Sequence, residues 1–241
     1  MNIVIPMAGR GERFRKDGYD KPKPLIEFGG KTMIEYALES LGLDANFIFI
    51  VYNYSENSLN QKLKQILNKY SKNIITIDYI TEGPASSALL ASNFINNDEP
   101  LLITNCDQIM NWDNQDFIKF INESNLDGVV VTYDSSTPKN SYVQIDENGV
   151  ALEFAEKQVI SNYSLNGIHY WKCGKYFVES ANKMIQKDIR CNNEFYISLT
   201  YNQMIESGMK VGIYHIDTSH HNAVGTPEDL EKYIKNRLNG Y

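Results

Sequence analysis

The sequence predicts an α/β fold: a mostly parallel sheet flanked by helices, with an antiparallel, β-rich insertion in the second half. Up to about residue 133, short apolar runs rich in β-branched residues alternate with longer segments of helical periodicity. Strands that are apolar along their whole length are typical of a parallel sheet covered on both faces. Beyond residue 140 the strand-like runs follow one another closely, with a turn signal at Asn148-Gly149, which indicates antiparallel pairing.

The first half opens with a buried strand at 2–7, followed by a long polar loop that reaches about residue 31. Segment 32–42 repeats apolar residues at helical spacing and ends at Gly42, so we expect an amphipathic helix there. The alternation continues with strands at 46–52, 74–80, 100–105 and 127–133 and with helices at 56–70, 85–96 and 113–124.

The second half has a different pattern, with its first strands close together. No linker, repeat or low-complexity segment interrupts the chain, so we expect one domain over residues 1–241. The predicted elements are strands at 141–146, 150–156 and 164–171, helices at 175–187 and 195–208, a strand at 210–217 and a closing helix from about 227.

The chain carries 23 basic and 30 acidic side chains, for a net charge of -7. Nucleic-acid-binding proteins usually carry the opposite sign, so the composition disfavours a nucleic-acid partner. A dense basic cluster lies within this acidic chain, which indicates a focused site for a small phosphorylated ligand. The members of the cluster are Arg10, Arg13, Arg15, Lys16, Lys21 and Lys23.

The three cysteines have no CxxC spacing, and their odd number indicates free thiols in a reducing cytosol. Cys106 lies among apolar residues and is interpreted as a small core residue. The N-terminus has neither a basic region nor a cleavage site, and no apolar run approaches the roughly 20 residues needed to span a bilayer. We therefore expect a cytoplasmic protein without a membrane partner.

The loop after the first strand contains Gly9, Gly11 and Arg13. Glycines allow tight turns and a close approach of main-chain N–H groups to phosphates. Two common phosphate motifs are incomplete: Phe14 replaces the third glycine of a dinucleotide fingerprint, and Leu25 replaces the first glycine of a Walker loop. The fingerprint also requires a helix where we expect a polar loop. An ordinary turn with surface arginines is the alternative interpretation.

Lys21 and Lys23 are each followed by a proline, which pushes the preceding residue into an extended conformation. Both lysines therefore lie on a stiff segment, and stiffness lowers the entropy cost of directing an ammonium group at a phosphate. A solvated Pro-Lys turn is the alternative.

Asp107 follows the apolar strand predicted at 100–105. Ligands of parallel sheets bind at the carboxyl ends of the strands, so an acid there is well placed to hold Mg²⁺ near a triphosphate. The alternative is an N-cap for the helix at 113–124, although Asn111 and Asp113 lie closer to that helix.

Glu156 and Lys157 end a predicted strand of the insertion. Taken by themselves, they are better interpreted as an ordinary charged strand end, because Lys and Glu are usually exposed.

Taken together, these motifs resemble the sugar-nucleotidyltransferase family, whose members have a Rossmann-like fold. The resemblance covers nearly the whole chain in the expected order. The family opens with a G-x-G-x-R loop, a P-K-P segment and a G-K-P-M-like segment, which residues 9–13, 22–25 and 30–34 match. The metal-binding Asp of the family matches Asp107.

Later motifs of the family also have counterparts. The E-K-P motif, whose Lys binds the acceptor phosphate, matches Glu156-Lys157, with Gln158 in place of Pro. The Asn-Gly acceptor strand resembles Asn166-Gly167, and the closing G-T-P-E-D-L stretch matches 225–230.

The resemblance implies a magnesium-dependent nucleotidyltransferase with a nucleotide-binding half at about 1–135 and an acceptor-binding half at about 136–241. Within the family, the chain most resembles the small cytidylyltransferases of surface-polysaccharide and phosphocholine decoration. That implies CTP and a small phosphorylated acceptor, with phosphoglutamine in capsular polysaccharide modification as the specific expectation. The alternatives are a sugar-1-phosphate enzyme that uses UTP, dTTP or GTP, and a non-catalytic nucleotide-sensing domain. A homodimer is a candidate assembly.

The resemblance also implies roles for individual residues. Arg13 and Lys23 are expected to hold the triphosphate and to stabilise the leaving pyrophosphate, and Lys157 to hold the acceptor phosphate. The aromatic residues of 193–196 are equally well interpreted as core residues at a helix start. Further nucleotide contacts are expected from Ala8, Gly9, Gly11, Glu82, Ser87 and Asp107, and further acceptor contacts from Asn166, Gly167, Glu194 and Tyr196.

Two departures from the family pattern leave parts of the site open. Many members carry a second metal-binding Asp at the position of Ala223, and here Asn222 or Asp217 is the candidate substitute. The base-recognising segment corresponds to about 82–87, which lacks the usual Gln and leaves the nucleobase open.

Overall fold

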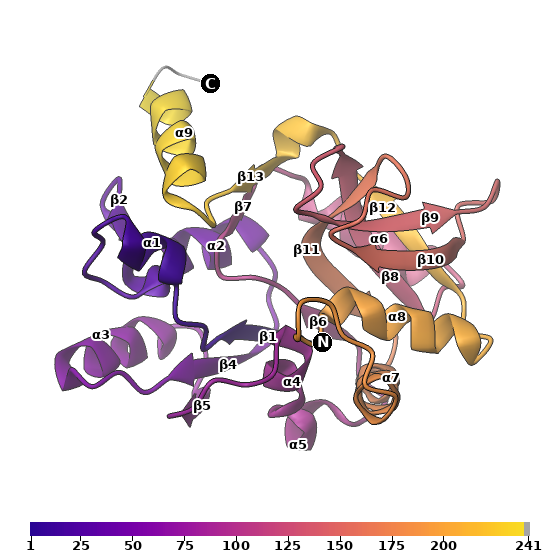
Figure 1. The fold of residues 1–241 in the computed structure, drawn as a ribbon, viewed down its shortest axis with the longest axis horizontal. Coiled ribbons are helices and arrows are strands. Elements are labelled where there is room, and N and C mark those ends of the chain that lie inside the picture. The colour runs from indigo at the N-terminus through magenta and orange to yellow at the C-terminus, as the bar shows by residue number, and fades with distance from the viewer. Residues whose placement is uncertain (239–241) are drawn as a thin grey trace.

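The computed structural model describes residues 1–238 of the chain. Strands and helices alternate along it, and Figure 1 labels them in chain order. The strands are β1 (Asn2–Met7), β2 (Glu27–Phe28), β3 (Lys31–Thr32), β4 (Asn46–Tyr52), β5 (Asn73–Ile77), β6 (Leu101–Ile103), β7 (Gln108–Met110), β8 (Gly128–Asp134), β9 (Ser141–Ile145), β10 (Ala151–Glu156), β11 (Tyr163–Trp171), β12 (Val211–His215) and β13 (His221–Ala223). The helices are α1 (Glu12–Lys16), α2 (Met33–Leu41), α3 (Asn57–Leu67), α4 (Pro84–Leu89), α5 (Ser92–Ile95), α6 (Asn114–Glu123), α7 (Gly174–Gln186), α8 (Ile197–Glu206) and α9 (Pro227–Leu238), with single 3-10 turns η1 (Lys23–Leu25) and η2 (Thr218–His220).

One large sheet joins both halves of the described chain, in the order β5-β4-β1-β6-β11-β8-β12, and the hairpin β9–β10 attaches to β11. Neighbours run parallel from β5 to β6, and β12 runs parallel to β8. The predicted fold class, a mostly parallel sheet with antiparallel strands in the second half, is confirmed. The antiparallel strands do not form a separate layer, however, because β11 lies inside the sheet and is antiparallel to both β6 and β8.

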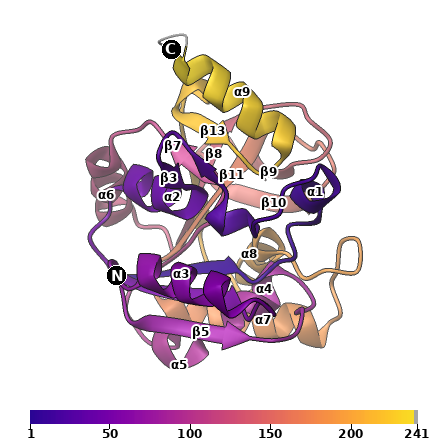
Figure 2. The same ribbon diagram turned by 90° about the vertical axis from the view of Figure 1, so that its left-hand side faces the viewer.

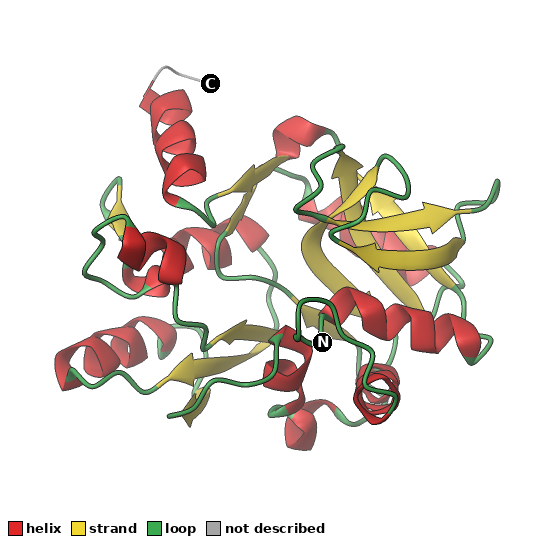
Figure 3. Cartoon of the chain, viewed as in Figure 1, coloured by secondary structure: helices red, strands yellow, loops and turns green. Residues whose placement is uncertain are grey.

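Helices cover both faces of the sheet, as Figure 3 shows. Alternate residues of β1 serve the two faces: Val4 packs in one core, and Ile3 and Ile5 pack in the other. The first core includes side chains of α4, α7 and α8, and the second includes side chains of α2, α3 and α6. Strands that are buried on both faces need apolar residues throughout, which explains the continuous apolar runs of the sequence. No helix within residues 1–238 is long and apolar enough to cross a membrane.

Two local predictions were wrong. The expected helix at 85–96 is divided into α4 and α5, because the amides of Leu90 and Ala91 bond three residues back, to Ser87 and Ala88, and tighten the chain there. The expected loop up to residue 31 contains α1, η1 and the β2–β3 ribbon. A short helix therefore does follow the glycine loop, directly after Gly11, whose φ is 61°.

An antiparallel pair of short strands that the sequence did not reveal, β7 with β13, brings the C-terminal segment to the turn after β6. Beyond β13, α9 lies near the loop after β1 (Figure 2). A third apolar core joins these segments, since Phe14, Ile26 and Phe28 pack there with Val224 and Leu230. The segment that follows β1 and the segment around β13 and the start of α9 therefore pack together, close to the turns after β1 and β6.

Candidate active site

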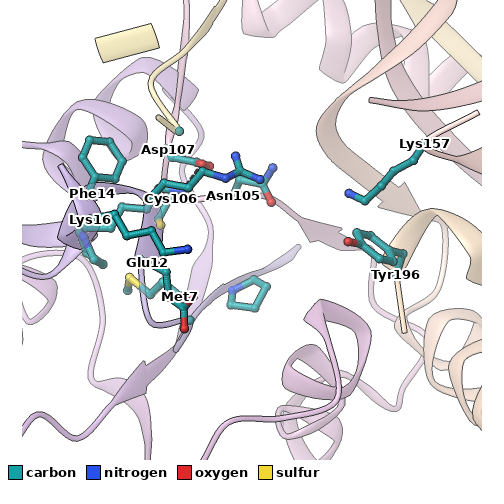
Figure 4. A pocket seen from close by; sticks show the side chains of 16 residues that line it. Met7, Glu12, Phe14, Lys16, Asn105, Cys106, Asp107, Lys157 and Tyr196 are labelled. Atoms are coloured by element: carbon teal, nitrogen blue, oxygen red, sulfur yellow. Dashed lines mark hydrogen bonds and ion pairs between the residues drawn. The ribbon is translucent and has the colours of Figure 1, made fainter. Parts of the chain in front are cut away.

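A cavity of about 660 Å³ opens where the turns after β1 and β6 face the loops after β10 and before α8. Figure 4 shows Lys157 and Tyr196 on one side of it and Asp107 with the residues around α1 on the other. A site at the carboxyl ends of parallel strands is the usual location in α/β sheets. The cavity brings together these predicted site residues: Gly9, Gly11, Arg13, Lys23, Asp107, Lys157 and Tyr196.

The glycine loop positions the basic residues of this cavity. Gly11 adopts a left-handed conformation, and a Cβ atom there would lie 3.3 Å from the Cβ of Lys23, so the two segments approach closely. Phe14, which replaces the third glycine of a dinucleotide fingerprint, is 1% exposed and anchors α1 in the third core. With Phe14 fixed, its neighbour Arg13 lines the cavity.

Lys23 and Asp107 form an ion pair between their Nζ and Oδ2 atoms, with side chains that are 22% and 20% exposed. Burial lowers the pKa of Lys23, but the Asp107 carboxylate more than offsets this effect, and the pKa is raised above its ordinary value. Lys23 is therefore a permanent cation at neutral pH. The predicted stiff lysine segment exists as η1, in which Lys23 is followed by the buried residues Pro24 and Leu25.

Asp107 is not a helix cap. The N-cap of α6 is Asp113, whose Oδ1 accepts a hydrogen bond from the Gln115 amide at 2.9 Å. The main-chain oxygen of Asp107 accepts a hydrogen bond of 2.9 Å from the Val224 amide, which ties the turn to the segment after β13. A Cβ atom on Gly225 would lie 2.5 Å from Asp107 Oδ2, so the absence of a side chain at 225 allows this approach.

Lys157 reaches the cavity from the turn after β10. Its φ is 56°, an uncommon value for a residue with a side chain, and its amide donates a 2.9 Å hydrogen bond to the Asn140 carbonyl. The ammonium lies 5.0 Å from the centre of the Tyr196 ring, and the Tyr196 hydroxyl donates to Glu194 Oε2 at 2.8 Å. Glu156 directly precedes Lys157 in the chain. The Glu156 carboxyl accepts a hydrogen bond from the Ser198 hydroxyl, and burial raises the pKa of this carboxyl.

Other predicted residues lie behind the cavity or beside it. Asn166 is 4% exposed, and its Oδ1 accepts a hydrogen bond from the Ile168 amide at 2.9 Å. Gly167 has a φ of 100°, and a Cβ atom there would lie 2.3 Å from Asn105 Nδ2, so this glycine makes room for the turn before Asp107. These residues shape the wall of the cavity without lining it directly.

The expected base-recognising segment does not line this cavity. Glu82 pairs with Arg190 at 3.2 Å, and the hydroxyl of the buried Ser87 lies 2.5 Å from that of Thr81. Ala8 is 5% exposed and belongs to the core. The main chain of this segment is hydrogen-bonded to Phe195, which links the segment to the turn before Tyr196. The sequence did not reveal this link.

A second cavity of about 1130 Å³ adjoins the first and shares Arg13 and Lys157 with it. Its walls come from the loop after β8, from β13 and from the start of α9. Sequence motifs marked Asn222 and the 225–230 stretch, but not that these segments meet the loop after β8, because they meet only through tertiary contacts. Asn222 lies here and not in the cavity of Asp107. Tyr133 and His221 lie here as well, with ring centres 4.3 Å apart, and burial lowers the pKa of His221 to about 4.

The donor set at Asp107 fits a magnesium ion only with help from a substrate. Within residues 1–238, no group of three or more His, Cys, Asp or Glu side chains is arranged to hold a metal. Magnesium, however, is commonly held by one or two carboxylates together with substrate phosphates and water. Asp107 would therefore fit as the protein ligand of a magnesium ion whose remaining ligands would be substrate phosphates and water.

The chain is similar in sequence to a known protein family and to several curated proteins. The family described as nucleotidyl transferase matches residues 3–239. The mannose-1-phosphate guanylyltransferase catalytic subunit beta of Dictyostelium discoideum is 31% identical over 165 residues, which cover 65% of this chain and 45% of that protein. The bifunctional protein GlmU of Methanocaldococcus jannaschii is 25% identical over 250 residues, covering 99% of this chain and 55% of that protein. The chain thus spans about half the length of these curated relatives.

Solved structures share the fold. A nucleoside-diphosphate-sugar pyrophosphorylase from Vibrio cholerae RC9 superimposes with a TM-score of 0.82 at 22% identity, covering 97% of this chain and 99% of that chain. The inositol-1-phosphate CTP transferase from T. maritima gives a TM-score of 0.75 at 17% identity, covering 97% of this chain and 93% of that chain.

Proposed function

This chain belongs to the nucleotidyl transferase family, and we propose that within the family it is a cytidylyltransferase that joins CTP to a small phosphorylated acceptor and releases pyrophosphate. The observation that carries the proposal is the arrangement of one cavity: Lys157 lies across it from Asp107 (Figure 4), Lys23 is paired with Asp107, and Arg13 lines the same cavity. Cations on two opposite sides of a cavity suit a reaction that brings two phosphorylated substrates together.

The nucleotide side of the cavity would bind the triphosphate through Arg13 and Lys23. Lys23 is held by its ion pair and by the prolines around it, and the backbone position of Arg13 is set by its buried neighbour Phe14. Fixed cations stabilise the charge that develops on the departing pyrophosphate without reorganising during the reaction. Gly9 and Gly11 leave the main chain of the loop open to phosphate oxygens.

The acceptor side would position the attacking phosphate through Lys157. A phosphate monoester has a second pKa near 6, so at neutral pH it is mostly a dianion and needs no general base to attack the α-phosphorus. The reaction also needs no nucleophile from the protein. Cys106 lines the cavity but is not activated for that role, because burial raises the pKa of its thiol to about 12. Catalysis would consist of positioning and charge neutralisation.

A magnesium ion held by Asp107 and the triphosphate would neutralise charge on the phosphate oxygens. Asn222 was expected as a further ligand, but its amide donates to the Ile109 carbonyl at 3.4 Å and it lines the second cavity. In the proposal, Asp107 is therefore the main protein ligand of the metal.

The finer substrate assignment is CTP with phosphoglutamine, in capsular polysaccharide modification. Its support is the resemblance of the motifs to small cytidylyltransferases, together with a fold shared with a CTP transferase. A sugar-1-phosphate acceptor with UTP, dTTP or GTP is the second candidate, favoured by the guanylyltransferases among the relatives.

A matrix of four nucleoside triphosphates against phosphorylated acceptors, with pyrophosphate release as the readout, tests the proposal. We expect release with CTP and magnesium, and the largest rate with phosphoglutamine among the acceptors. Release with another triphosphate and a sugar 1-phosphate would favour the second candidate. Nucleotide binding with no release for any pair would indicate a nucleotide-sensing domain instead.

A further inference from the structure

Two neighbours crowd the carboxylate of Asp107. Its Oδ2 contacts the ammonium of Lys23. The main chain at Gly225 is also so close that a Cβ atom there would lie 2.5 Å from Oδ2 and 3.7 Å from Lys23 Nζ. The Val224 amide holds this segment in place through its bond to the Asp107 carbonyl. A cation that approaches Oδ2 therefore meets the position that Lys23 already occupies.

A divalent cation without a nucleotide gains little binding free energy at this carboxylate. Within the described chain, Asp107 is not part of any cluster of three or more metal-ligating acidic, His or Cys side chains. A metal on Oδ2 would either displace the Lys23 ammonium or lie beside it, and like charges a few ångströms apart repel strongly in a partly buried site. A triphosphate changes this balance, because its oxygens offer the ammonium another anionic partner.

We propose that Lys23 is a resident counter-ion of Asp107 that keeps the metal out until a nucleotide arrives, so that metal and nucleotide bind cooperatively. The inference rests on the proposed function, since it takes Asp107 as the protein ligand of the nucleotide-bound metal. Coupling of this kind is reciprocal, so the metal must strengthen nucleotide binding by the same factor. Lys23 thereby acts in two ways: it binds phosphate in the loaded site and it neutralises Asp107 in the free protein.

Binding of Mn²⁺ to the nucleotide-free protein, followed by electron paramagnetic resonance, tests the proposal without turnover. We expect Lys23→Met to bind Mn²⁺ more tightly than the unchanged chain, on the order of tenfold. Lys16→Met is the matched control, because Lys16 is another cation of the same cavity and has no ion pair with Asp107 among the described contacts. An equal gain in both variants would mean a general charge effect and would overturn the proposal.

Two further arms complete the test. Adding Asp107→Asn to Lys23→Met should return the Mn²⁺ affinity to that of the unchanged chain or below. Adding CTP to the unchanged chain should raise its Mn²⁺ affinity. Tight Mn²⁺ binding by the nucleotide-free, unchanged chain would overturn the inference. Near-ultraviolet circular dichroism verifies the fold, and Lys23→Gln replaces Lys23→Met if that variant does not fold. Absence of pyrophosphate release with these metal results intact would refute the proposed function alone, whereas release without metal–nucleotide coupling would refute the inference alone.

Discussion

The ammonium of Lys157 lies 5.0 Å from the centre of the Tyr196 ring, so the residue directly after β10 is held against the residue that precedes α8. A contact of this kind stabilises a cation by about 0.5–1 kcal/mol at an exposed site. Glu194 fixes the hydroxyl of Tyr196 at 2.8 Å, and the adjacent Phe195 amide donates to the Glu82 carbonyl. The position of Lys157 therefore depends on contacts with both halves of the chain.

The first prediction concerns Lys157→Ala. This substitution should raise the KM of the acceptor on the order of tenfold or more, because it removes a charge-assisted contact to the phosphate. The affinity for CTP should remain nearly unchanged, since Lys157 faces the nucleotide side from across the cavity. Calorimetric titration with CTP and steady-state titration of the acceptor measure the two effects separately. A large loss of CTP affinity with an unchanged acceptor KM would contradict the assigned role.

The second prediction concerns the cations of the nucleotide side. Arg13→Ala and Lys23→Ala should each lower kcat/KM on the order of 10²–10³, as expected for lost stabilisation of transition-state charge. Both variants should keep the far-ultraviolet circular dichroism of the unchanged chain. Arg15→Ala serves as a control, because Arg15 belongs to the same helix but does not line the cavity. Near-normal turnover in either cavity variant would refute the assignment.

The third prediction concerns the metal. Asp107→Asn keeps the shape of the side chain but removes its charge, so magnesium-dependent pyrophosphate release should fall on the order of 10²-fold or more. Removing magnesium with a chelator should have a comparable effect on the unchanged chain. Activity as a function of magnesium concentration provides the measurement. An unchanged magnesium requirement in the variant would place the metal on other residues.

The fourth prediction concerns two glycines of the same cavity. Gly225→Ala should destabilise the free protein by about 1–3 kcal/mol, because the added methyl group would overlap with Asp107 Oδ2. Gly9→Ala is the matched control, since a Cβ atom at Gly9 meets nothing within 4 Å. Neither glycine has a positive φ, so the backbone tolerates alanine at both positions. Urea denaturation of both variants gives the comparison, and equal stabilities would show that the segment at 225 moves freely.

The fifth prediction concerns pH. His169 is buried beside Trp171 and Tyr201, and burial lowers its pKa to about 3 from an ordinary value of 6.5. Between these values the unfolded chain binds more protons than the folded chain, so acid lowers stability there, by up to about 1.4 kcal/mol per pH unit for one histidine. His169→Phe should retain the ring stack and reduce this slope between pH 6 and 4. Urea denaturation across that range should show the difference, and identical slopes would exclude His169 as the cause.

Much of the fold was predictable because periodicity is a local property. The apolar runs located β1, β4 and β8, and helical spacing located α2, α3 and α7. Local chemistry also indicated which residues of the first half would meet. Gly9, Gly11 and Asp107 follow strands of one parallel sheet, and the carboxyl ends of such strands lie at the same edge. The sequence by itself therefore determined the fold class and the nucleotide side of the candidate site.

Tertiary structure alone decided how the second half completes that site. The pairing of β7 with β13, the approach of Gly225 to Asp107 and the contact of Lys157 with Tyr196 have no local signature. It also decided that Asn222 faces a different cavity from Asp107. Each of these contacts joins residues that are far apart in the chain, and their geometry depends on how the sheet and the helices pack. Local propensity determines where a strand or a turn forms, but the packing of the whole core determines which distant residues that strand or turn contacts.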